Sequence, residues 1–270
     1  MEKLIEILKE FDIKRDEYIN KKNWKEKSDE EKYNAVAEWF RPCAEKILCE
    51  GYFFVNGKYI IDLGCIELYY HEENGDIKDP IMYHTNEHPS KSEVFQLNNG
   101  EYPYFKIGSF NLHQSGVDVT FESEKDKNDK YRASFLIRSY RVFKENEEDK
   151  VYDLSIPFDK CSTHIFDDMF YEGISFDKKS RTNIEWVKLK VPKEKNIEVP
   201  LPRKNVAWYR KNGEKFEKVT ESDFINNEKR FYDDGYFKPV NYPQFFPYNG
   251  KSYLQDPKLW QFKRKNIKER

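Results

Sequence analysis

The spacing of apolar residues in the first fifty positions predicts helices. Apolar side chains recur every three or four residues at Leu4, Ile5, Leu8 and Phe11. This is the period of one helix face. Ser28 followed by Glu31 forms a capping-box pattern ahead of a second apolar stripe, which is typical of a helix start. Pro42 has no amide hydrogen to donate within a helix, so we expect it to end or kink the second helix.

From residue 52 onward the pattern changes to one that predicts β-strands. Two runs rich in β-branched and aromatic residues flank Asn56-Gly57, the dipeptide that most favours a tight hairpin turn. Further apolar runs occupy residues 103–110, 115–122 and 131–143. Helices followed by a series of strands predict an α+β fold.

Charge is segregated along the chain, although the net charge is only −2. Residues 51–176 hold 13 basic and 23 acidic side chains, whereas residues 177–218 hold 13 and 6, and residues 258–270 hold 6 and 1. Clustered Lys and Arg residues can bind nucleic-acid phosphates, and a solvated surface is the alternative. The chain therefore divides into a helical segment (1–50), a β-rich core (51–176) and a basic, aromatic extension (177–270) that we expect to pack on the same domain.

The composition excludes several classes of protein. Aromatic residues make up 17 % of the chain, which argues against intrinsic disorder despite 36 % charged residues. The sequence has no apolar stretch long enough to span a membrane and no apolar signal core at its start, so we expect a cytoplasmic protein. The four cysteines lie outside any CxxC spacing, and we expect them to be reduced and structural.

The strand expected at residues 59–70 carries a carboxylate among apolar neighbours. Counting alternate positions places five residues on one face: Ile61, Leu63, Cys65, Glu67 and Tyr69. The other face also holds apolar residues: Ile60, Ile66, Leu68 and Tyr70. Glu67 would then be shielded from water, and burial of a carboxylate makes it a better general base. A Glu that reaches solvent, or that pairs with a buried Arg, is the alternative.

Two other polar residues are embedded in apolar strands. Arg138 shares a face with Leu136 and Tyr140 in the run 131–142. A buried guanidinium needs a carboxylate or phosphate partner. Glu67 with Arg138 is therefore either a structural pair or a base beside an anion clamp. Asp118, between Val117 and Val119, is the third such residue.

Metal and nucleotide chemistry have little support in the sequence. His84 and His88 are four residues apart, but Pro80 and Pro89 bracket them and make a helix unlikely there. No Cys or carboxylate completes a zinc spacing around these histidines. The motifs of nucleophilic-serine hydrolases, P-loops and dinucleotide-binding turns are missing from the sequence. We therefore expect no metal site and no cofactor.

The order of four runs resembles the methylpurine-DNA glycosylases. The runs are IDLGCIELYY (61–70), DPIMYH (79–84), GSFNLHQSGVDVTF (108–121) and YRASFLIRSYRV (131–142). That family has a strand ending in Glu-x-aromatic, a His that follows an acidic segment, a Gly-containing strand with a polar amide, and a strand of the form Ala-x-x-Leu-Leu-Arg. The resemblance covers roughly residues 55–145, and it implies a single domain with a curved, mostly antiparallel sheet flanked by helices.

The resemblance implies roles for individual residues. Glu67 would be the general base, Tyr69 and His84 would sandwich a flipped base, and Arg138 would help to hold the water and the sugar-phosphate. Asp118 stands where the family has an Asn near the base pocket. The Tyr that the family wedges into the duplex has no clear equivalent in this sequence, and Phe110 or Asn111 lies nearest to its position.

The expected function is that of a DNA-base N-glycosylase that removes a modified, alkylated purine from damaged duplex DNA. Such an enzyme extrudes the nucleotide, stacks the base on aromatic side chains and delivers water to C1′. It needs no metal or redox cofactor. Two alternatives stay open: a non-catalytic nucleic-acid-binding protein on the same fold, and a hydrolase of another N-glycoside such as a nucleoside or nucleotide.

Overall fold

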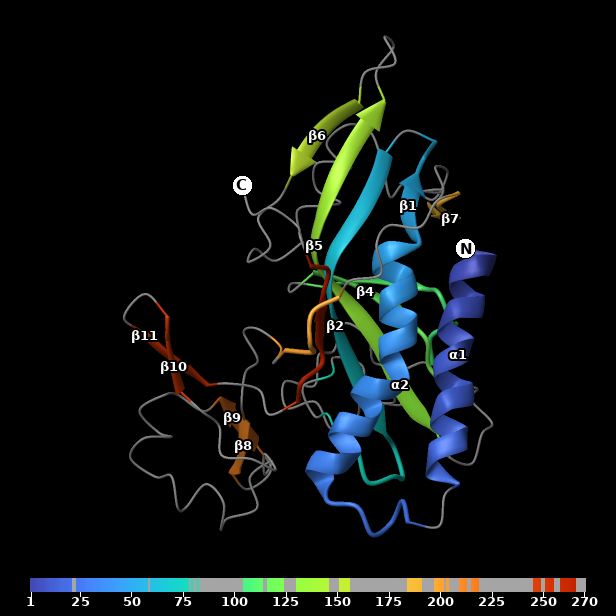
Figure 1. Ribbon diagram of the computed structural model, residues 1–270. Coiled ribbons are helices and arrows are strands. Elements are labelled where there is room, and N and C mark those ends of the chain that lie inside the picture. Colours follow the sequence, from blue (N-terminus) through green and yellow to red (C-terminus); the bar gives the residue numbers. More distant parts are fainter. Residues whose placement is uncertain are drawn as a thin grey trace.

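The computed structural model describes residues 1–20, 23–57, 59–77, 79, 82, 104–113, 116–123, 130–145, 151–155, 184–190, 197–201, 203, 209–212, 215–218, 245–248, 251–254 and 258–265. These residues form two helices and a curled antiparallel sheet (Figure 1). The predicted α+β class is therefore confirmed. Two small hairpins lie outside this sheet: β8 (Tyr209–Asn212) with β9 (Lys215–Lys218), and β10 (Phe245–Tyr248) with β11 (Lys251–Leu254).

Both N-terminal helices form where the apolar spacing predicts them. Helix α1 spans Glu2–Ile19 and helix α2 spans Asp29–Cys49. The capping box is confirmed, because the Ser28 hydroxyl accepts the Glu31 amide hydrogen and the Glu31 carboxylate accepts the Ser28 amide hydrogen. Pro42 does not end α2, which continues through it to Cys49. The buried face of α2 continues past Pro42 with Cys43 and Ala44, and its packing outweighs the single backbone hydrogen bond that a proline removes.

The main sheet is antiparallel throughout the described residues. Its path runs β3 (Phe110–His113), β4 (Gly116–Thr120), β5 (Tyr131–Glu145), β2 (Tyr59–Glu72), β1 (Gly51–Val55) and β7 (Ile184–Lys188). Strand β6 (Val151–Ser155) pairs with β5, and β12 (Gln261–Lys263) pairs with β2. The turn between β1 and β2 has Asn56 at φ 52° and Gly57 at φ 67°, which confirms the hairpin predicted there.

Strand β2 is the centre of the sheet because both of its edges are paired. Along one edge, β5 pairs with it from Tyr59 to Glu72. Along the other edge, its first residues pair with β1, and the residues from Cys65 to Glu67 pair with β12. Strands β7 and β12 both come from the last third of the chain, so that segment completes the sheet that the first half begins.

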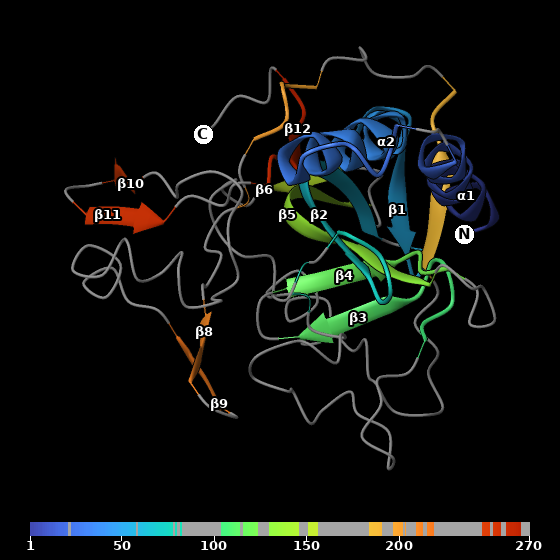
Figure 2. The same cartoon turned by 90° about the horizontal axis from the view of Figure 1, so that it is seen from below.

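The sheet curls around the two helices (Figure 2). Helix α1 contacts β7 at one end of the strand order. It also packs against the turn before β3 at the other end, where an added Cβ on Gly108 would lie 3.2 Å from Ile5 Cγ1. Phe11 and Phe40 fill the space between the helices and the sheet, and each contacts the Phe121 ring. We call the opposite side of the sheet, turned away from the helices, the outer face.

Two compensating bulges at the centre of the sheet decide which residues reach the outer face. Leu63 pairs with Tyr140, Cys65 with Ser139, and Ile66 with Ile137. This register leaves Gly64 as an extra residue on β2 and Arg138 as an extra residue on β5. A bulge of this kind re-aims side chains and is frequent beside functional sites.

The bulges correct the expected alternation of side chains. Ile61 and Leu63 belong to the same helix-side core as Ile66, Leu68 and Tyr70. Uninterrupted alternation would have placed the first two on the opposite face from the last three. The expectation that Glu67 and Tyr69 share a face with Ile61 and Leu63 is therefore wrong, because the extra residue Gly64 reverses the alternation. Tyr140, expected beside Arg138, also lies in the helix-side core.

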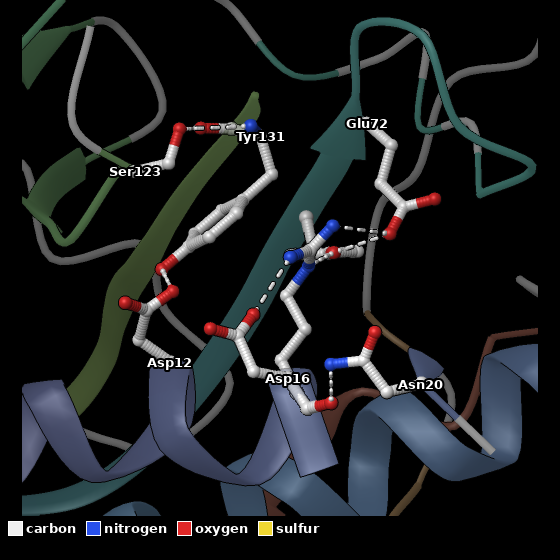
Figure 3. Close-up of polar contacts among 8 residues, drawn as sticks. Asp12, Asp16, Asn20, Glu72, Ser123 and Tyr131 are labelled. Carbon is white, nitrogen blue, oxygen red and sulfur yellow. Dashed lines mark hydrogen bonds and ion pairs between the residues drawn. The ribbon is translucent and has the colours of Figure 1, made fainter. Parts of the chain in front are cut away.

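A buried ionic network fixes α1 to the sheet (Figure 3). Arg15 Nη2 lies 3.2 Å from Glu72 Oε1, and both side chains are almost completely buried. Arg15 Nε donates to the Tyr70 hydroxyl, which in turn donates to Glu72 Oε1. The Tyr131 hydroxyl donates to Asp12 of α1 at 3.1 Å. Burial of an Arg in this network explains why a basic residue can lie on the core side of α1.

Replacement of Arg15 by Leu would remove the guanidinium that forms the buried ion pair with the Glu72 carboxylate. Breaking a buried ion pair costs about 3–5 kcal/mol, so we expect Arg15→Leu to lower the free energy of unfolding by that amount. The neighbouring Lys14 pairs with Glu17 on the exposed face of α1, and Lys14→Leu should change stability little. Chemical denaturation of both variants tests this, and equal stability of the two would contradict the structural role of Arg15.

Candidate functional site

A row of residues crosses the outer face of the sheet at the level of Glu67. The Cα register pairs Gln261 of β12 with Glu67 of β2, Glu67 with Leu136 of β5, Leu136 with Asp118 of β4, and Asp118 with Asn111 of β3. Directly opposite residues on neighbouring strands point to the same face. All five side chains of the row are buried. The row thus collects two carboxylates and two amides whose side chains are largely shielded from solvent.

The Glu67 carboxylate lies between Gln261 and Leu136 in this row and is held by residues from three strands. Gln261 Nε2 donates to Glu67 Oε1 at 2.8 Å. Arg138 Nε, on the β5 bulge, lies 3.5 Å from the same oxygen. The Tyr69 hydroxyl donates to Glu67 Oε2 at 3.4 Å. Glu67 is fully buried, and these donors favour its ionised form in a place where burial alone would oppose it.

Tyr69 is the aromatic neighbour of Glu67, and a guanidinium covers one face of its ring. The Arg203 Cζ atom lies 4.5 Å from the centroid of the Tyr69 ring and 5.1 Å from that of Trp260. Cations bind favourably over aromatic faces. Burial raises the pKa of Tyr69 well above its ordinary value, and the nearby Glu67 charge adds to that effect. Tyr69 therefore stays protonated and can act only as a neutral hydrogen-bond donor or stacking surface.

Arg203 is itself fixed by a buried carboxylate. Its two terminal nitrogens donate to the two oxygens of Asp79 at 2.7 and 3.1 Å, and both side chains are fully buried. Burial raises the pKa of Asp79, but Arg203 and Lys258 outweigh it and hold that pKa below its usual range. The Asp79 amide hydrogen is donated to His71 Nδ1 at 3.0 Å. The Asp79–Arg203 pair therefore contacts the group around Glu67 through the Tyr69 ring, which lies under Arg203 and whose hydroxyl donates to Glu67.

The structure brings together three of the residues that the sequence singled out: Glu67, Tyr69 and Arg138. Asp118 lies in the same row on the outer face, two strands from Glu67. Phe110 does not join them, because it packs against the helix-side core with its ring centroid 5.5 Å from that of Phe53. His84 lies outside the described residues.

Gln261, Arg203 and Asp79 contribute to the site but were not singled out from the sequence. Gln261 lies 194 positions from Glu67 in the chain, so no local pattern relates them. Arg203 belongs to a segment whose basic charge suggested a solvated or phosphate-binding surface. Asp79 begins the run DPIMYH (79–84), in which the sequence indicates no role for its carboxylate. The one local signal is the place of Gln261 between Trp260 and Phe262, which marks a polar side chain in an apolar strand.

The described residues contain no group of three or more His, Cys, Asp or Glu side chains placed to hold a metal ion. Cys43, Cys49 and Cys65 are buried free thiols. Burial raises the pKa of Cys43 to about 12, so its thiol is unreactive at neutral pH. Of the helices in the described residues, none is long and apolar enough to cross a membrane.

Comparison with protein-family models, with curated proteins and with solved structures finds no match for this chain.

The Asp79–Arg203 pair makes a pH-dependent contribution to stability. Because the folded-state pKa of Asp79 is depressed, its stabilisation is present above the unfolded value of about 3.9 and is lost as the pH falls through the folded value. We expect Arg203→Met to lower the free energy of unfolding by about 3–5 kcal/mol at pH 7. The decrease in the free energy of unfolding should be smaller near pH 3, because Asp79 in the variant is then protonated and no buried charge is left without a partner.

Denaturation of Arg203→Met and of the control Arg41→Met at both pH values tests this expectation. Arg41 pairs with Glu38 and Glu45 on the exposed side of α2. A destabilisation by Arg203→Met that is the same at pH 7 and pH 3 would show that Asp79 is not held ionised by Arg203.

Proposed function

We propose that this protein is a DNA-base N-glycosylase that removes a modified, alkylated purine through water activated by Glu67. The observation that carries the proposal is the convergence of Glu67, Arg138 and Tyr69 on the outer face of the sheet. These are the residues to which the resemblance to methylpurine-DNA glycosylases gives the roles of base, anion clamp and stacking surface. Buried charged groups beside a titratable group with a raised pKa, here Tyr69, are frequent at functional sites.

The proposed reaction is a hydrolysis with Glu67 as general base. The oxygen of water attacks C1′ of the flipped nucleotide, and the bond between C1′ and the base nitrogen breaks. The electron pair of that bond leaves with the base, and the proton of the attacking water passes to Glu67. Alkylation gives a purine a positive charge, so the departing base becomes neutral without an added acid. Gln261 and Arg138 both approach Oε1, whereas the Tyr69 hydroxyl approaches Oε2 at the longer distance of 3.4 Å, so we assign the proton to Oε2.

The neighbouring residues fit the binding of a base. Arg203 covers one face of the Tyr69 ring, so the flipped base would stack on the other face. Asp118 would accept hydrogen bonds from amino groups of the base. The basic segments 177–218 and 258–270 would contact DNA phosphates, and the site would work in the cytoplasm without a metal or cofactor.

Glu67→Gln should slow excision strongly while keeping the fold, because an amide of the same shape cannot take a proton from water. Loss of a general base lowers rates by about 10²–10⁴-fold. The matched control is Asp62→Asn, also on β2, where the carboxylate pairs with Arg264 at 3.0 and 3.1 Å. We expect Asp62→Asn to retain excision.

The assay incubates wild type and both variants with methylated duplex and with hypoxanthine-containing duplex and scores abasic sites. Excision that persists undiminished in Glu67→Gln would disprove the role of Glu67. Release of a base from free nucleosides but not from duplex would favour the hydrolase of another N-glycoside.

Binding without catalysis is the second candidate function. It is favoured by the complete burial of Glu67 and by the two nitrogen groups at Oε1, which also suit a purely structural ion pair. On this account, wild type and Glu67→Gln would bind the same duplex with equal, salt-dependent affinity, and neither would form abasic sites.

A further inference from the structure

Gln261 has a fixed place beside the Glu67 carboxylate. Its backbone amide hydrogen is donated to the Leu201 carbonyl at 2.8 Å, and the Leu201 amide hydrogen is donated back at 2.9 Å. On its other side, β12 pairs with β2, where Gln261 is the direct partner of Glu67. Gln261 is only 3 % exposed. The side-chain amide is thus presented to Glu67 from a strand that is paired along both edges.

The two residues that flank Gln261 in the sequence, Trp260 and Phe262, are also held in place by contacts with α2. Trp260 is fully buried, and its indole Nε1 donates to the Tyr33 carbonyl of α2 at 3.0 Å. Phe262 also lies on the helix side, with its ring centroid 5.3 Å from that of Phe40 of α2. Neither contact involves Glu67. The packing of this segment therefore depends on Trp260 and Phe262. That packing does not explain why the buried amide of Gln261 lies between them.

A buried amide is costly unless it is hydrogen-bonded, and an apolar residue would serve packing alone better. Gln261 instead directs Nε2 at Oε1, which fixes the rotation of the carboxylate about its last bond and leaves Oε2 on the Tyr69 side. Four charged or titratable groups share this surrounding: Tyr69 on β2, Arg138 on β5, Asp118 on β4, and Arg203 on the segment beside β12.

We propose that Gln261 is a positioning residue that orients the Glu67 carboxylate and holds it in the ionised form. Its catalytic consequence rests on the proposed function. Gln261 does not touch substrate; it acts through Glu67. Strand β12, the last one in the described residues, therefore completes a site whose other main residues lie on β2 and β5.

The catalytic arm of the test measures steady-state kinetics of Gln261→Leu and of the control Asp62→Asn on methylated duplex. Asp62 lies on β2, as Glu67 does, but its carboxylate pairs with Arg264 and not with the residues around Glu67. Misplacement of a catalytic group costs on the order of 10²-fold in rate, so we expect kcat to fall about 10–100-fold in Gln261→Leu with KM little changed. The acidic limb of kcat/KM should move to higher pH, because the ionised base has lost a donor. A merely structural role would lower the melting temperature and leave the pH profile unchanged, which would overturn the proposal.

The second arm needs no activity and uses Gln261→Glu. Two facing carboxylates share a proton in the folded state more tightly than in the unfolded chain, whose carboxyl groups titrate near pH ~4.3. The deficit in melting temperature of Gln261→Glu relative to wild type should therefore be small near pH 4 and grow as the pH rises toward 8. A deficit that is equal at both pH values would overturn the placement of Gln261 against Glu67.

The two arms distinguish failure of the proposed function from failure of the role assigned to Gln261. If wild type excises no base from any duplex but the deficit of Gln261→Glu grows with pH, the proposed function is wrong and the hold of Gln261 on Glu67 stands. If excision depends on Glu67 but neither the pH profile nor the deficit responds to position 261, the proposed function stands and the role of Gln261 is wrong.

Discussion

The burial of one negative charge, that of Glu67, constrains the centre of this protein. A carboxylate removed from water is unstable unless donors replace its hydration. Here those donors come from three strands: the Tyr69 hydroxyl, Arg138 Nε and Gln261 Nε2. The strands can deliver them only if the sheet is complete, with β5 on one edge of β2 and β12 on the other. The site and the fold therefore depend on the same pairing.

The bulges connect this constraint to the core. Without the extra residue Gly64, Leu63 could not lie on the helix side together with Ile66 and Leu68. One of the two parts of β2 would then turn its apolar side chains away from the helices. With it, the inner side of the sheet is filled by aromatic rings, and the charged groups gather on the outer face. The Glu72 carboxylate is buried as well, on the helix side where α1 meets the end of β2, and there Arg15 of α1 supplies the compensating charge.

The sequence predicts the features that depend on residues close together in the chain, and it does not predict those that depend on residues far apart in it. The two helices, the capping box and the Asn56-Gly57 hairpin depend on neighbouring residues, and local patterns identified them. Burial of Glu67 and its partnership with Arg138 could be inferred because both stand in apolar strands. The bulges could not be inferred, because a register shift is decided by pairing between strands far apart in the chain. Gln261 and Arg203 were missed for the same reason: tertiary contacts alone bring them to Tyr69 and Glu67.

We propose that the Glu67 carboxylate is held ionised for use as a base. The most direct measurement is the rate of base excision from methylated duplex in single turnover as a function of pH, for wild type and Glu67→Gln. We expect the wild-type rate to rise with pH through one ionisation to a plateau, and the variant to show a low rate without that ionisation. An identical pH profile in the two proteins would contradict this role of Glu67.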